Sequence, residues 1–89
     1  MEMKIEYKTL PEGMDLDALR RGLDETLEDD GWLVGSAHTA EGGYVELELE
    51  DERHNPKYGI IAVKNYLKSI RVAPDTTMEL AGHVVGVYE

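Results

Sequence analysis

In Tyr44-Val45-Glu46-Leu47-Glu48-Leu49-Glu50, apolar and charged residues alternate without a break. Successive side chains of a β-strand point to opposite faces of a sheet, so this pattern predicts a strand with one buried and one wetted face. Three carboxylates in one row make the wetted face anionic. That face is expected to carry Tyr44, Glu46, Glu48 and Glu50.

The flanking strands are placed relative to residues 44–50. Residues 2–8 alternate in the same way, and we expect them beside residues 44–50 because Lys4 would then lie across from a carboxylate. Residues 32–40 form a weaker strand, which a three-residue loop at 41–43 joins to residues 44–50. That loop length predicts that His38 lies opposite Glu46 on the wetted face.

Two helices are predicted from apolar residues that recur at intervals of three and four. The first covers about residues 16–30, with Asp15 as its N-cap and a glycine after its last turn. Trp32 would then pack on the end of this helix as a structural clamp. The second helix covers about residues 56–70, and its N-cap is Asn55.

The last strand begins near Met78, and its alternation is lost beyond Gly82. The order of elements is strand, helix, strand, strand, helix, strand, which resembles the split βαβ or ferredoxin-like pattern. This is an α+β two-layer sandwich, with both helices on one face of an antiparallel sheet. Right-handed crossovers give the strand order 4-1-3-2, counted along the chain. We expect one domain over residues 1–89.

Charge and composition narrow the classes of function. The chain has 19 acidic residues against nine basic ones, and 16 of the acidic residues lie before residue 53. This balance disfavours binding to nucleic acid or to an anionic membrane, because phosphate contacts need clustered lysine and arginine. The chain has no cysteine, no signal-peptide pattern and no apolar run of roughly 20 residues. A cytoplasmic location is therefore expected.

The sequence contains no pattern typical of catalysis. His38, His54 and His83 fall on separate elements, and two of these are opposite edges of the expected sheet, so no shared metal site is predicted. There is no phosphate-binding glycine loop and no nucleophile with a specific activating base. We expect neither enzymatic activity nor a cofactor.

Acidic runs extend the wetted face of residues 44–50. The run at 28–30 falls at the end of the first helix, where the helix dipole disfavours negative charge. We expect a binding protein that presents carboxylates to a basic protein partner, as an inhibitor, an immunity-type protein or a nucleic-acid mimic would. Solubility alone is an equally simple interpretation. The candidate binding residues are Tyr44, Glu46, Glu48, Glu50, Asp51, Glu52, Glu28, Asp29 and Asp30.

The alternative hypothesis is a homo-oligomeric regulatory or assembly domain that binds a small ligand between subunits. It depends on the last strand, which lies at the sheet margin and has an unprotected edge in the expected order. A bulge at Gly82, or burial of the valines in the core, would explain the same pattern without an interface. The candidate edge residues are Val84, Val85, Val87 and Tyr88.

Overall fold

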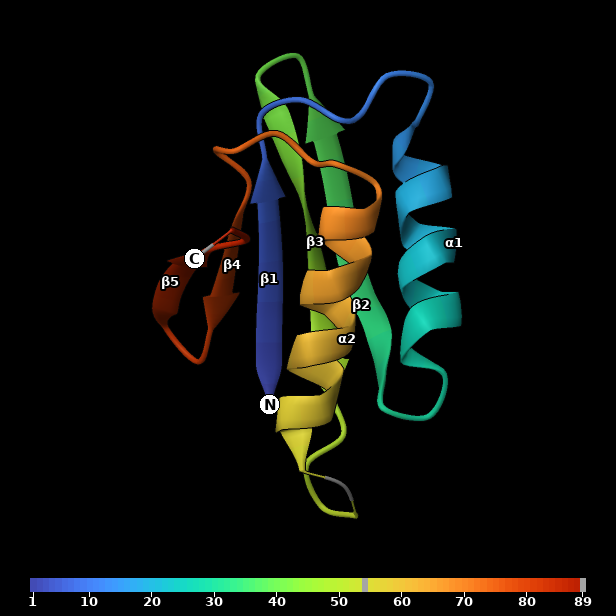
Figure 1. The fold of residues 1–89 in the computed structure, drawn as a ribbon, viewed down its shortest axis with the longest axis vertical. Helices are drawn as coiled ribbons and strands as arrows, with labels where there is room; N and C mark the ends of the chain where they lie inside the picture. The colour runs from blue at the N-terminus through green and yellow to red at the C-terminus, as the bar shows by residue number, and fades with distance from the viewer. Residues whose placement is uncertain (54, 89) are drawn as a thin grey trace.

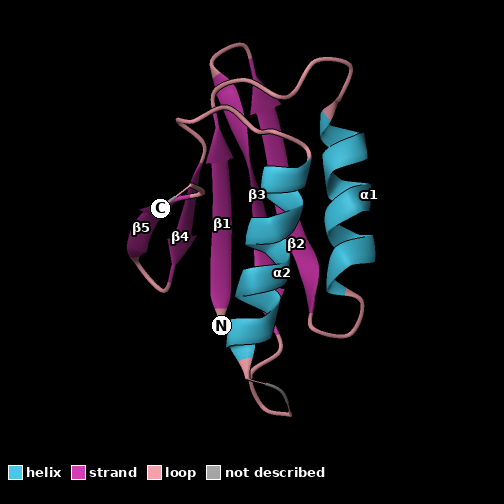
Figure 2. Cartoon of the chain, viewed as in Figure 1, coloured by secondary structure: helices cyan, strands magenta, loops and turns pink. Residues whose placement is uncertain are grey.

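The computed structural model describes residues 1–53 and 55–88, which form two helices and one sheet (Figures 1 and 2). The strands are β1 (Glu2–Tyr7), β2 (Gly31–Thr39), β3 (Gly42–Leu49), β4 (Thr77–Leu80) and β5 (His83–Gly86). The helices are α1 (Leu16–Leu27) and α2 (Pro56–Ser69). Both helices cover the same face of the sheet, and no described segment covers the opposite face. We call the uncovered side the open face.

The sheet has five antiparallel strands in the order β2-β3-β1-β4-β5, so the predicted ferredoxin-like order 4-1-3-2 is wrong. The expected last strand is a hairpin, in which Leu80 lies opposite His83. Ala81 and Gly82 make its turn, with φ angles of 49° and 89°. Two positive φ angles are what a two-residue hairpin turn of type I′ requires. Gly82 therefore reverses the chain instead of only bending one strand.

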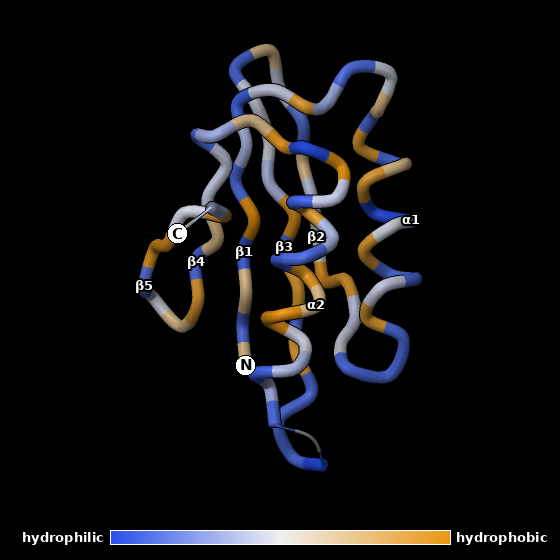
Figure 3. Tube along the Cα trace, viewed as in Figure 1, coloured by the Kyte–Doolittle hydropathy of each residue, from blue (hydrophilic) through white to orange (hydrophobic). Residues whose placement is uncertain are grey.

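The pairing of β1 with β3 agrees with the sequence, because Lys4 lies opposite Glu46. Alternate residues of both strands point toward the helices, and Figure 3 shows apolar positions recurring along these strands. The apolar residues of the alternating strands and of the helix periodicity form one contiguous core. From these patterns we expect Ile5, Leu19, Leu23, Leu27, Val45, Leu47, Leu49, Ile60, Val63 and Leu67 in it, and all are there, with Ile60 only partly buried.

Both predicted helix starts are confirmed. The Asp15 carboxylate accepts a hydrogen bond of 2.8 Å from the backbone N–H of Ala18. The Asn55 side chain accepts one of 3.0 Å from Lys57, and a proline occupies the first turn of α2. Each cap satisfies a backbone donor that the first turn of a helix leaves without an intrahelical partner.

The end of α1 differs from the prediction. The helix stops at Leu27, and Glu28 leaves it with a φ of 48°. Gly31 belongs to β2, and a Cβ at this position would lie 2.7 Å from the carbonyl oxygen of Glu48. Close packing of β2 against β3 therefore requires this glycine, which has no role in capping the helix.

The β2–β3 hairpin also differs from the predicted register. Thr39 lies opposite Gly42, so Ala40 and Glu41 form a two-residue turn. The predicted pairing of His38 with Glu46 is wrong, because His38 lies opposite Gly43 and Gly35 lies opposite Glu46. A bulge between Leu33 and Gly35 adds one residue to β2. From Gly35 onward, each side chain therefore lies on the opposite face from the one that simple alternation predicts.

The two glycines at the start of β3 make room for Tyr7 and do not form the turn. A Cβ on Gly42 would lie 2.3 Å from the Tyr7 carbonyl oxygen, and one on Gly43 would lie 2.5 Å from the Tyr7 hydroxyl. That hydroxyl lies 2.9 Å from Nδ1 of His38, and the two rings stack. Burial raises the pKa of Tyr7 above its ordinary value. The pattern taken for a loop is a close approach between β3 and β1.

We predict that Leu47→Ala lowers the free energy of unfolding by about 2–5 kcal/mol, as for other buried leucines. The reason is that the side chain is almost completely buried between the sheet and the helices. Urea unfolding followed by circular dichroism measures the change. A loss below about 1 kcal/mol would contradict the placement of this residue in the core.

We predict that Gly43→Ala destabilises the fold by about 1–3 kcal/mol, the usual range for overpacking. The added methyl group would contact the ring of Tyr7 and the carbonyl oxygen of Ala37. Gly35→Ala is the matched control in the neighbouring strand, because its nearest neighbour is a carboxylate oxygen at 4.0 Å. Equal unfolding midpoints for the two variants would rule out this function of Gly43.

Candidate interaction site on the open face

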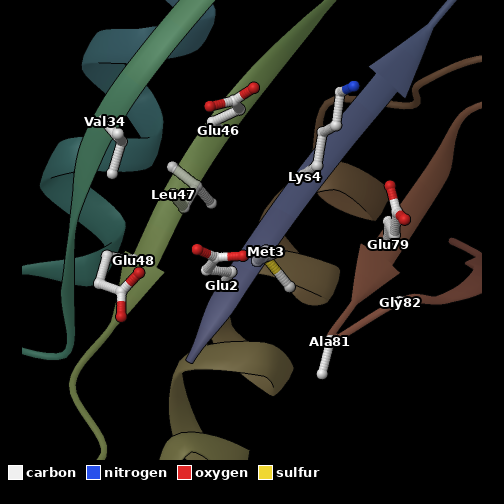
Figure 4. Close-up of a pocket in the computed structure, with 10 residues that line it drawn as sticks. All are labelled: Glu2, Met3, Lys4, Val34, Glu46, Leu47, Glu48, Glu79, Ala81 and Gly82. Atoms are coloured by element: carbon white, nitrogen blue, oxygen red, sulfur yellow. The ribbon is translucent and has the colours of Figure 1, made fainter.

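The open face gathers carboxylates from three adjacent strands. Glu46 of β3 and Glu79 of β4 both lie opposite Lys4 of β1, so a cation stands between two anions across the sheet. Figure 4 looks onto this face and shows the carboxylates on the three central strands. The described strands place five carboxylates on it: Glu2, Glu6, Glu46, Glu48 and Glu79.

Lys4 is the one lysine or arginine that the described strands place on this face. Its Nζ lies 3.3 Å from Oε1 of Glu6 and 4.7 Å from the ring centroid of Tyr44. The hydrogen bond to Glu6 is the largest cause that raises the pKa of Lys4, and the charges of Glu46 and Glu79 add to it. One ammonium cannot balance five carboxylates, so the face remains anionic.

The centre of the face is a shallow hollow of about 280 Å³ (Figure 4). It follows β1 and β3 and ends against the turn of the β4–β5 hairpin. The carboxylates stand around it, while Val34 and the Ala81–Gly82 turn supply apolar surface. A concave surface with a few polar groups is a common form of binding site. Its principal charged lining residues are Glu2, Lys4, Glu46, Glu48 and Glu79.

Large apolar side chains border the carboxylates. Trp32 is 50% exposed, Val34 is 61% exposed and Val84 is 65% exposed. Trp32 lies opposite Glu48, and Val84 lies opposite Glu79, so both share the face with the charges. The prediction of Trp32 as a clamp on α1 is wrong, because the helix ends before it and β2 turns its side chain outward.

The two acidic runs, at residues 28–30 and 50–52, meet at one end of the molecule. The backbone N–H of Glu50 donates a hydrogen bond of 2.8 Å to the carbonyl oxygen of Asp30, which links the segment after α1 to the segment after β3. Figure 3 draws both segments as hydrophilic. The exposed carboxylates of this end are Glu28, Asp29, Asp51 and Glu52, while Asp30 is partly buried.

Three carboxylates near this end have structural contacts. Glu50 lies beyond β3, and its Oε1 accepts hydrogen bonds from the backbone N–H groups of Arg53 and Glu52. These bonds, the one from Arg53 first, lower the pKa of Glu50 below its ordinary value. The Met1 ammonium contacts Glu48 and Asp51 at 3.1 and 2.9 Å. Glu50 therefore orders a turn and does not belong to the row on β3.

The four predicted edge residues do not share one surface. Val84 is exposed on the open face, and Val85 is partly buried on the side of the helices. Val87 is completely buried in the core, and the Tyr88 hydroxyl donates a hydrogen bond to the Val72 carbonyl oxygen. Of the four, Val84 offers the largest exposed fraction at the β5 edge.

Several residues of the face were not among the predicted binding residues. Trp32 was missed because it was expected to pack on the end of α1. Val34 lies in the bulge of β2, for which Gly35 is the only signal in the sequence. Glu79 was missed because its neighbours depend on the pairing of β4 with β1. Within residues 1–53 and 55–88, no group of three or more acidic, histidine or cysteine residues has the geometry to hold a metal ion. His54 lies outside the described residues.

We predict that Lys4→Gln destabilises the protein, because it removes the cation that offsets the repulsion between the carboxylates. The loss should be larger at low salt than at high salt, since fewer ions then screen that repulsion. Folding raises the pKa of Lys4, so this contribution is present at neutral pH and is lost as the pH rises through the folded-state pKa. Urea unfolding at two salt concentrations tests this. Lys8→Gln, just outside β1, is the control, and equal salt dependence of both variants would contradict the account.

Comparison with known proteins gives no guide to the function of this site. No family model, no curated protein sequence and no solved structure matches the chain. Neither described helix is long and apolar enough to cross a membrane. What bears on function is the open face itself, where the described strands place five carboxylates, one lysine and an exposed tryptophan.

Proposed function

We propose that this protein is a cytoplasmic, non-enzymatic binding domain whose open face docks a basic protein partner, as an inhibitor, an immunity-type protein or a nucleic-acid mimic does. The observation that carries the proposal is the position of Trp32 and Val34 beside the carboxylates of β1 and β3. A face that only maintained solubility would have no need of large apolar side chains among its charges.

The two kinds of side chain have different parts in the proposed binding. Carboxylates spread over three strands attract a cationic partner and speed its association, while they repel nucleic acid and anionic membranes. Trp32 is the residue type that most often dominates the affinity of an interface when it becomes buried. In this proposal the hollow that the carboxylates surround binds a projecting side chain of the partner.

A second candidate function is self-association through β5, which the exposed Val84 at the sheet edge favours. In this case the domain acts as a homo-oligomer in regulation or assembly, with a small ligand between subunits. Light scattering after size-exclusion chromatography separates the two candidates. A monomer at high concentration favours the basic partner, and a Val84-dependent dimer favours self-association.

We predict that replacing Glu46, Glu48 and Glu79 by glutamine abolishes capture of basic proteins from a cell lysate at low salt. Where association can be followed, its rate should fall by about tenfold or more. The control variant replaces Glu12, Asp24 and Glu41 by their amides, since these residues are exposed and lie outside the strands. It has the same net charge as the first variant.

The control variant should keep the captured proteins, because only the charges on the open face are proposed to contact them. Mass spectrometry of the captured proteins, with urea unfolding to confirm that both variants are folded, gives the readout. Unchanged capture by the open-face variant would contradict the proposal. Equal loss in both variants would show that net charge alone attracts the partner, and this would also contradict it.

A further inference from the structure

The sheet has two free edges, and they differ in length and protection. β5 has four residues, which is short for an edge that pairs with another strand. β2 has nine residues and contains neither proline, lysine, arginine nor a carboxylate. Among the described residues no strand pairs with its outer side. Apart from the bulge at Val34, β2 has no proline, lysine or carboxylate that would protect this edge.

On the open face, the second half of β2 has little side-chain cover, because Gly35 and Ala37 are small. Gly35 lies opposite Glu46, and a Cβ on Gly35 would lie 4.0 Å from Oε2 of Glu46. The Glu46 carboxylate therefore leans toward β2, over a position that has no side chain. Val34, in the bulge just before Gly35, lies beside this gap (Figure 4), and Trp32 faces the same side nearer the start of the strand.

The spacing of strands decides which side chain on an added strand would fill the gap. A strand paired with the outer side of β2 would lie about 10 Å from the backbone of β3, which is two strand spacings. Lysine and arginine are long and end in a cation, so they extend over Gly35 toward the Glu46 carboxylate. Their aliphatic stems and charged groups also pack well on the ring of Trp32.

We infer that the free edge of β2 binds an extended segment of the basic partner as a sixth strand, with lysine or arginine at alternate positions on the open face. This deepens the proposed function and rests on it. Backbone pairing supplies the affinity of strand addition, and side chains at alternate positions supply its selectivity. A second copy of this chain is a poor occupant, because its β2 would bring no lysine or arginine toward Glu46.

The probe for this inference is an acetylated eight-residue peptide in which lysine and threonine alternate. Trp32 is the single tryptophan of the chain and lies on β2, so its fluorescence reports binding directly. Residues whose side chains share one face of a strand also direct their N–H groups to the same edge. Methylation of the backbone nitrogens of the lysines therefore blocks one edge of the peptide. Methylation of the backbone nitrogens of the threonines blocks the opposite edge.

The expected result is that one of the two N-methylated peptides binds at least about tenfold more weakly than the other, because a few backbone hydrogen bonds are lost on one edge only. The charges and side chains of the two peptides are the same. Equal affinity of the two methylated peptides would overturn strand addition, whatever that affinity is. Failure of the unmodified peptide to bind would overturn it as well.

Gly35→Lys is the matching change in the protein, because it places a cation beside Glu46 and fills the gap. It should lower the affinity of the unmodified peptide by about tenfold, while Gly35→Ala, which has room for its methyl group, should retain binding. Urea unfolding of both variants confirms that the fold is kept. Equal affinity of the lysine and alanine variants would contradict the approach over Gly35.

The same peptides separate this inference from the proposed function. If glutamine at Glu46, Glu48 and Glu79 abolishes binding while the two methylated peptides bind equally, the basic partner stands and strand addition fails. If the methylated peptides differ but the glutamine variant binds normally, the edge pairs with a strand and the acidic face is not what selects the partner.

Discussion

The burial of alternate side chains along β1 and β3 fixes both the register of the sheet and the residues that face solvent. Met3 and Ile5 of β1 pack with Val45 and Leu47 of β3 beneath the helices, so every intervening residue must face outward. A slip of one residue would bury charges and expose the core, and this fixes the register. The carboxylates of the open face are therefore held in place by the same packing that stabilises the fold.

This arrangement couples stability to charge. Carboxylates brought together on adjacent strands repel one another, and a high net charge destabilises the compact state. Lys4 offsets part of this repulsion through Glu6 and through its position between Glu46 and Glu79. A basic partner would offset the remainder, so binding and folding would reinforce each other. The buried sides of the helices carry no such charge repulsion, since they are apolar.

Local patterns in the sequence were sufficient to predict the core, the two helix caps and the pairing of β1 with β3. Asp15 and Asn55 act on donors within their own helices, so their roles do not depend on distant residues. The errors concern glycines. Gly31 and Gly43 are required by the approach of another strand, and Gly82 by a turn that only strand pairing reveals.

The facing of β2 was unpredictable for the same reason. The bulge beside Gly35 turns one half of the strand relative to the other, and no alternation in its small residues marks the change. Trp32 precedes the bulge and was missed because it was expected to pack on the end of α1, whereas Glu79 came to the site only through the pairing of β4 with β1. The charged half of the candidate site could be predicted from the alternation of residues 44–50, whereas its apolar half depends on tertiary pairing.

The most direct test of the open face as the binding surface is NMR chemical-shift mapping with the basic protein that capture identifies. The largest changes in backbone amide shifts should lie on β1, β2 and β3, together with the indole N–H of Trp32. Changes concentrated instead on α2, around its exposed Tyr58 and Ile61, would contradict it.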